Sequence, residues 1–205
     1  MNDEILTAQN DLAFMRSLVD REGAPAQAGA GRVFLAAGLI YGLQCLAQWA
    51  GLAGYVPAPL VLNVWVGGLP TLLLLVVIAW MTVKNRGLPQ STVQRALNAV
   101  FSAMGMANVA VLALFAVQAL KRHDWTIWEM YGCVVFAFQG AGWLAAFALR
   151  KRLWLLVVAL GWLAVSVAMS VLLGTTTYVL VAALALLVLM ALPGLAMVAA
   201  ARRQA

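Results

Sequence analysis

The sequence predicts an all-α integral membrane protein, a six-transmembrane-helix bundle preceded by a cytoplasmic amphipathic N-terminal helix. Three observations predict this fold. Of the 205 residues, 65% are hydrophobic and only 10% are charged, whereas soluble domains carry roughly 25% charged residues. The apolar residues form long runs without the periodicity of an amphipathic helix, so the outside of the bundle must face lipid. The basic residues cluster beside these runs, where membrane topology requires them.

The first predicted element is a helix over residues 2–23, which is too polar to enter a bilayer. Asn2 or Asp3 can cap its N-terminus, and Gly23 and Pro25 are expected to end it. The segment contains five acidic residues and two arginines, so its side chains carry a net charge of −3. Residues 24–31 follow as a predicted flexible tether.

One face of this N-terminal helix carries an apolar stripe at the spacing of a packing surface, formed by Ile5, Ala8, Leu12, Met15 and Val19. Such a stripe must be buried. It can dock on the basic loops of its own chain, bind a basic cytoplasmic protein partner, or pair with a second copy. The lipid headgroup layer is the less favourable fourth candidate, because it is anionic and suits basic helices. The candidate partner-binding residues are therefore Ile5, Leu12, Met15, Val19, Asp11 and Glu22.

Six spans follow, because a hydrocarbon core about 30 Å thick needs roughly 20 helical residues. The predicted spans cover residues 32–51, 60–83, 95–120, 125–149, 152–173 and 178–201, which together form one bundle over residues 32–201, and residues 202–205 form a tail. The links between spans are short and rich in turn-forming residues, so none can hold a separate domain. Pro70 and Pro193 are expected to kink the second and sixth spans.

The distribution of basic residues predicts that both termini are cytoplasmic. Eleven Lys and Arg residues fall on one side of the predicted bundle, and only Lys121 and Arg122 fall on the other. The dominance of arginine, alanine and leucine suggests a multi-pass protein of a bacterial inner membrane. Lipid is then the first partner of the chain, and the basic charge needs no nucleic acid to explain it.

Polar residues inside the spans form a candidate intramembrane polar site, which consists of Gln44, Asn108, Gln139 and Ser166 near the bilayer centre and Glu129 nearer the outer surface. Polar groups are costly in hydrocarbon unless they are paired. The central layer either joins helices by hydrogen bonds of about 0.6 kcal/mol each or lines a binding site or a water-filled path. Glu129 is either the charged group of an outward-facing vestibule or part of an ordinary helix end. Gly38 and Gly42 form a GxxxG pair that favours close helix packing.

We expect no enzyme activity, no cofactor and no metal site. His123, Asp124 and Glu129 are too few titratable groups for a catalytic or metal centre, and the common catalytic motifs are absent from the sequence. Cys45 and Cys133 fall inside apolar runs without metal-ligand spacing.

Two functions compete. One is a regulatory or sensor-like protein that binds a cytoplasmic partner, or its own copy, through the N-terminal helix. The other is a small channel or transporter for a solute or ion that uses the polar layer.

Overall fold

The computed structural model describes residues 2–56, 60–84 and 91–204, with side chains described over 27–56, 69–84 and 91–203. Helices are the only regular structure in these residues. They are α1 (Asn2–Leu52), α2 (Leu60–Lys84), α3 (Thr92–Arg122), α4 (Trp125–Arg150), α5 (Leu153–Val171), α6 (Thr176–Leu186), the π-helical turn η1 (Leu187–Ala191) and α7 (Leu192–Gln204). The predicted all-helical class is confirmed.

The helices are long and apolar enough for a membrane bundle. Five segments could cross a bilayer: Gln27–Leu52, Thr92–Arg122, Trp125–Arg150, Leu153–Val171 and Thr176–Arg203. In the sixth predicted span, α2, the described side chains cover Leu69–Lys84, which is apolar but shorter than a full crossing. Length and composition therefore indicate a helical membrane bundle of five or six spans.

Residues 24–31 differ from the expectation of a flexible tether, because α1 continues through them without a break. Alternating alanines favour helix here, and the end of this stretch packs against α7. A Cβ atom on Gly31 would lie 2.9 Å from the carbonyl oxygen of Gly194. The helix therefore does not end at Gly23 and Pro25 as expected. The side chains of the predicted apolar stripe lie outside the described residues.

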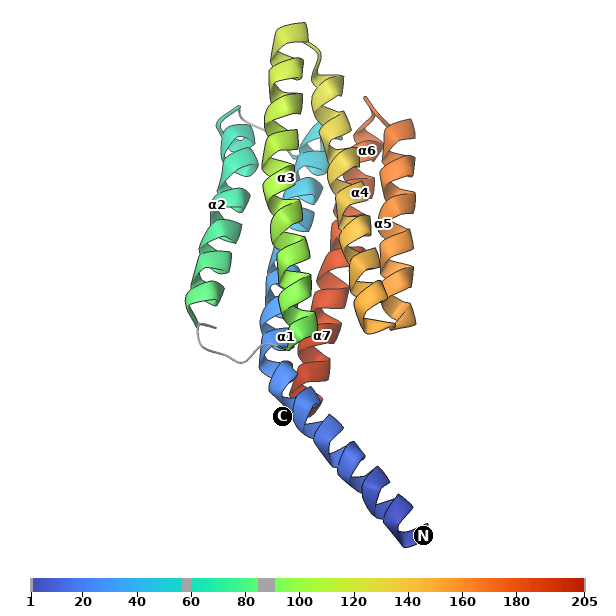
Figure 1. Cartoon of the computed structure of the whole chain (residues 1–205). Helices are drawn as coiled ribbons and strands as arrows, with labels where there is room; N and C mark the ends of the chain where they lie inside the picture. The colour runs from blue at the N-terminus through green and yellow to red at the C-terminus, as the bar shows by residue number, and fades with distance from the viewer. Residues whose placement is uncertain (1, 57–59, 85–90, 205) are drawn as a thin grey trace.

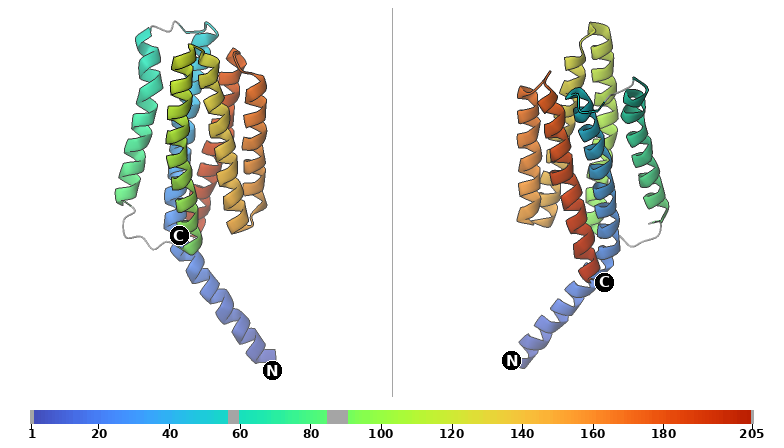
Figure 2. Two further views of the ribbon diagram at one scale, coloured as in Figure 1. Left: turned by 45° about the horizontal axis from the view of Figure 1, so that its top comes forward. Right: turned by 180° about the vertical axis from the view of Figure 1, so that it is seen from behind.

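The helices form two packed groups, with α2 at the edge (Figure 1). In one group α1 lies along α6, η1 and α7, and in the other α4 lies between α3 and α5. Among the described residues, α2 packs closely only against α1, and it stands apart from the other helices in every view (Figure 2). The N-terminal part of α1 projects away from the bundle at the end where the C-terminus also lies, which we call the terminal end (Figures 1 and 2).

Small residues bring the backbones of α1 and α7 into contact. A Cβ atom on Gly38 would lie 2.5 Å from the backbone nitrogen of Ala191, and one on Gly194 would lie 2.5 Å from that of Leu35. The space beside Gly42 is filled by Leu187, whose Cδ2 lies 2.7 Å from where a Cβ atom on Gly42 would be. These distances confirm that the GxxxG pair is a helix-packing surface. We call the contact of α1 with α6, η1 and α7 the glycine seam.

The sixth predicted span is interrupted by η1, which directly precedes Leu192 and Pro193. Proline has no backbone N–H, so it cannot donate to the carbonyl of Leu189 four residues earlier. The indole Nε1 of Trp162, on α5, donates to that carbonyl at 3.1 Å. The backbone irregularity expected at Pro193 therefore takes the form of a π-helical turn, with one carbonyl bonded by a neighbouring helix.

Candidate functional site

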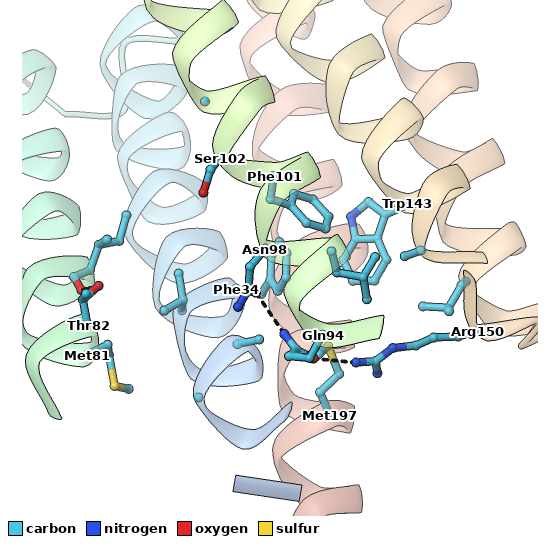
Figure 3. Close-up of a pocket in the computed structure, with 18 of the residues that line it drawn as sticks. Phe34, Met81, Thr82, Gln94, Asn98, Phe101, Ser102, Trp143, Arg150 and Met197 are labelled. Atoms are coloured by element: carbon cyan, nitrogen blue, oxygen red, sulfur yellow. Dashed lines mark hydrogen bonds between the residues drawn. The ribbon is translucent and has the colours of Figure 1, made fainter. Parts of the chain in front are cut away.

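A cavity of about 700 Å³ lies at the terminal end of the bundle (Figure 3). Its volume is within the range of roughly 300–1,000 Å³ that is typical of small-molecule sites. Four helices, α1 to α4, form most of its wall, and α5 and α7 complete it. The lining residues are Gly29, Ala30, Val33, Phe34, Ile78, Met81, Thr82, Gln94, Leu97, Asn98, Phe101, Ser102, Gly105, Trp143, Ala146, Arg150, Trp154, Leu155 and Met197.

Large aromatic side chains form the inner wall of the cavity. The ring of Phe34 lies 5.2 Å from that of Phe101 and 5.1 Å from that of Trp143, measured between centroids. Trp154 continues the wall, with its ring 6.0 Å from Trp143. In this region α1 meets α3 and α4 through rings rather than through close backbone contacts, unlike its contact with α7 at the glycine seam.

A chain of polar side chains forms the corner of the cavity nearest the terminal end. The Nη2 of Arg150 donates to the Oε1 of Gln94 at 2.7 Å, and the Nε2 of Gln94 donates to the Oδ1 of Asn98 at 3.0 Å. Gln94 is only 5% exposed. It is placed in the first turn of α3, where the side chain of Ser91 caps the helix by accepting from the backbone N–H of Gln94. We call these three residues the Arg150 chain.

The Arg150 chain carries positive charge, and the residues with described side chains place no acid near it. After Glu22 the sequence contains only two carboxylates, Asp124 and Glu129, and both lie at the start of α4, at the end opposite Arg150. Within residues 27–203, Arg150 therefore has no carboxylate at its own end of the bundle. A guanidinium group has five N–H donors and no acceptor. The corner therefore presents hydrogen-bond donors and positive charge to the cavity.

The predicted layer of polar residues does not line this cavity. Gln44, Asn108 and Gln139 each bury an amide oxygen that has no hydrogen-bond partner among the described residues. The side chain of Asn108 lies beside the hydroxyl group of Tyr131. Ser166 behaves differently, because its hydroxyl donates to the carbonyl of Cys133 at 2.8 Å. That bond joins α5 to α4, so Ser166 acts as an interhelical hydrogen-bond donor. A binding site formed by the other residues of the layer stays a prediction.

Glu129, near the start of α4, lies against the turn that joins α5 to α6. Its Oε2 accepts a hydrogen bond of 2.6 Å from the backbone N–H of Gly174, and its carbonyl accepts one of 2.6 Å from the hydroxyl of Tyr178. Gly174 has a φ of 75°, a left-handed conformation that suits glycine. Glu129 thus fastens three helices together at this end. This arrangement favours a structural role, and it places Glu129 far from the Arg150 chain.

Sequence reasoning missed Gln94 and Arg150 as site residues. Arg150 was counted only as a topological charge, since a membrane-facing arginine and a ligand-binding one look alike in sequence. The available signal was the absence of any acid from the corresponding end of the chain after Glu22.

Among the described residues, no group of three His, Cys, Asp or Glu side chains lies close enough to hold a metal ion. Comparison of the chain with protein-family models, with curated proteins and with solved structures finds no match.

Proposed function

We propose that this protein is a regulatory, sensor-like membrane protein with both termini in the cytoplasm. It holds a cytoplasmic partner, or a second copy of itself, through the acidic segment over residues 2–23. The continuity of α1 carries the proposal. The same helix begins at Asn2 and contributes Phe34 to the wall of the cavity. A ligand in the cavity and a protein at the N-terminal segment would therefore act on one element.

Packing around α1 suggests how the two ends communicate. The glycine seam fixes α1 to α7 by backbone contact, whereas Phe34 meets α3 and α4 through rings. When the cavity is filled, α1 and α7 move together relative to α3, α4 and α5. The N-terminal segment moves with them, because it belongs to the same helix. Two arrangements that differ in affinity for a ligand are sufficient for such a switch.

Charge indicates the kind of partner. The segment has a net side-chain charge of −3, and in Figures 1 and 2 it projects away from the helices of its own bundle. A basic protein surface therefore fits it better than lipid or its own loops. The charged candidates Asp11 and Glu22 lie on the same segment as the apolar candidates Ile5, Leu12, Met15 and Val19.

The test is deletion of residues 2–23 from the tagged protein. We expect the deletion to abolish co-purification of the partner, or of a second, differently tagged copy, while thermal unfolding of the bundle is unchanged. Replacement of Asp11 and Glu22 by lysine should have the same effect in the full-length chain. Asp124→Lys, at the opposite end, is the matched control and should leave co-purification intact. An unchanged set of co-purifying proteins after the deletion would contradict the proposal.

A small channel or transporter is the second candidate, and one observation favours it. The unpartnered amide oxygens of Gln44, Asn108 and Gln139 come from α1, α3 and α4, and such oxygens can replace the water around a permeating ion or solute. Flux in reconstituted liposomes should then fall when Gln139 is replaced by leucine. Glu129→Gln should weaken folding more than flux, because Glu129 holds the α5–α6 turn. Flux that survives both substitutions would exclude a path through these residues.

A further inference from the structure

We propose that the cavity at the terminal end binds one anionic amphiphile, with a carboxylate or phosphate head at Arg150 and an aliphatic tail against Phe34, Phe101 and Trp143. The proposal rests on the proposed function only in treating this cavity as the sensing site, and it names the chemical class that would be sensed. Binding itself requires no partner protein, so it can be measured separately.

Charge is the first argument. The guanidinium of Arg150 is held in place by Gln94, a neutral residue, through a bond of 2.7 Å. Gln94 is in turn oriented by Asn98, so its own oxygen stays directed at Arg150. This arrangement fixes the cation without neutralising it. An arginine held in this way binds carboxylates and phosphates well, because its planar group matches their oxygens.

Depth is the second argument. Trp154 lies at the start of α5, and Trp80 lies near the end of α2 with the Nζ of Lys84 4.9 Å from its ring centroid. Tryptophan and lysine in this arrangement are typical of the headgroup layer of a membrane. Arg150 is at the same end of the bundle. The cavity continues along α3 from Gln94 to Gly105, which corresponds to roughly 16 Å of helix and reaches hydrocarbon depth.

Access from the bilayer is the third argument. The cavity lies between α1, α2 and α3, yet α2 packs closely only against α1 among the described residues. Asn98 and Ser102 are exposed on α3 and point toward α2 (Figure 3). Ile78, on the α2 side, is 39% exposed. An amphiphile dissolved in the membrane can therefore reach the cavity sideways between α2 and α3, with its head already at the level of Arg150.

The experiment uses quenching of tryptophan fluorescence by bromine, because Trp143 and Trp154 line the cavity. The full-length protein is placed in nanodiscs of phosphatidylcholine and titrated with ω-bromododecanoate or, as the neutral counterpart, ω-bromododecanol. We expect saturable quenching by the carboxylate with about tenfold higher affinity than by the alcohol, the factor that one charge-assisted bond of about 1.4 kcal/mol provides. Replacement of Trp143 and Trp154 by phenylalanine should remove the saturable component. Trp125→Phe, at the opposite end, should not remove it.

Variants at the corner test the head group. Arg150→Gln should remove the preference for the carboxylate, which is a loss of about tenfold in affinity. Gln94→Glu, which keeps the shape of the side chain, should have the same effect because it supplies Arg150 with a carboxylate. Gln94→Glu also keeps the proposal testable if Arg150→Gln fails to fold. Arg152→Gln is the matched control, since Arg152 is exposed at the same end and does not line the cavity.

A second pair of probes distinguishes the source of the amphiphile. Phosphatidylglycerol with brominated chains is compared with brominated phosphatidylcholine in the same nanodiscs. Quenching by the anionic lipid that depends on Arg150 supports a bilayer phospholipid as ligand, whereas quenching by free bromododecanoate alone supports a single-chain acid. Either result supports the proposal.

The proposal is overturned by three results. They are quenching that rises linearly without saturation, equal affinity for the acid and the alcohol, and an acid preference that Gln94→Glu leaves unchanged. Loss of partner binding after deletion of residues 2–23 is a separate measurement. Failure of one proposal is therefore distinguishable from failure of the other.

Discussion

The two sides of α1 are built differently. On one side, the glycine seam presses α1 against α6, η1 and α7 so closely that a Cβ atom on Gly31 or Gly38 would lie within 3 Å of backbone atoms, and one on Gly42 would meet the side chain of Leu187. On the other side, α1 packs against α2 but makes few close contacts with α3, which it meets, like α4, through Phe34, and a cavity lies between α1, α2 and α3. The first side leaves no alternative arrangement for the backbones, and the second leaves several for the side chains.

This difference between the two sides of α1 indicates on which side a ligand is expected to act. In lipid, helices associate through close packing and hydrogen bonds rather than through the hydrophobic effect. A seam of small residues therefore fixes the geometry of the bundle, whereas a junction of large rings around a cavity can be rearranged by a ligand. The hydrogen bonds agree with this division. The indole N–H of Trp162 is bonded to the carbonyl of Leu189 beside the seam, and that of Trp143 at the cavity is buried with no partner in the described part of the chain.

The largest expected effect comes from filling the seam. Gly194→Val would place a side chain 2.5 Å from the backbone nitrogen of Leu35, and a backbone atom cannot move aside cheaply. We expect the free energy of unfolding to fall by about 3 kcal/mol, the upper part of the usual range for overpacked cores. Reversible unfolding in mixed micelles titrated with sodium dodecyl sulfate measures this change.

Gly105→Val is the matched control on the cavity side. Nothing lies within 4 Å of a Cβ atom at Gly105, and valine and glycine differ by only a few tenths of a kcal/mol in helix propensity, so this substitution should change the free energy of unfolding by less than about 0.5 kcal/mol. Equal effects of the two substitutions would show that the two sides of α1 do not differ as described.

A smaller effect separates the two buried tryptophans. Trp162 is 0% exposed and Trp143 is 2% exposed, so replacing either one by phenylalanine removes a similar buried volume. Trp162→Phe also removes the hydrogen bond to the carbonyl of Leu189, whereas Trp143→Phe removes an N–H that has no partner among the described residues. We therefore expect Trp162→Phe to cost about 1–2 kcal/mol more than Trp143→Phe in the same unfolding assay.

Pro193→Ala tests the cause of this difference. It supplies the backbone N–H that proline lacks, so it should reduce the cost of Trp162→Phe when the two substitutions are combined. It should not change the cost of Trp143→Phe. If the changes in unfolding free energy from Pro193→Ala and Trp162→Phe simply add, the backbone N–H at position 193 does not replace the indole N–H as a donor to the Leu189 carbonyl.

The sequence predicted the parts of the fold that depend on local pattern. Helix bounds in α2 to α5 agree with the predicted spans within a few residues, because hydropathy and length follow directly from the residues. The close packing at Gly38 and Gly42 was also predictable, since small residues at this spacing have few other uses in a membrane helix. The helical backbone over residues 24–31 was not predicted, because Pro25, Gly29 and Gly31 disfavour helix locally.

The candidate site was harder to predict than the fold. Phe34, Phe101 and Trp143 come from three helices, and nothing in their local sequence places their rings together. Gln94 precedes the third predicted span and carried no prediction, and the bond from Arg150 crosses 56 positions of sequence. The uneven placement of acids marks this whole end of the bundle as basic, but it does not distinguish Arg150 from the other basic residues there.

The smallest expected effect on stability is at α2. The hydroxyl of Tyr41 donates to the Oγ1 of Thr71 at 3.2 Å in an exposed position, so Tyr41→Phe should lower the free energy of unfolding by only about 0.6 kcal/mol. Its effect on geometry should be larger, because among the described residues α2 packs closely only against α1. Spin labels on Val76 of α2 and Val109 of α3, both exposed, should show a broader distribution of distances in the variant.

Thr82→Val is the control for this last comparison. The hydroxyl of Thr82 donates to the carbonyl of Ile78 in its own helix at 2.8 Å, so its loss leaves the contact between α2 and α1 intact and the distance distribution unchanged. Broadening in Tyr41→Phe but not in Thr82→Val would mean that α2 is held to α1 in part by one exposed hydrogen bond. The same variant should then admit the brominated amphiphile faster, because access to the cavity runs between α2 and α3. A narrow distribution in both variants would mean that α2 is fixed as firmly as α7, and lateral access to the cavity would have to be abandoned.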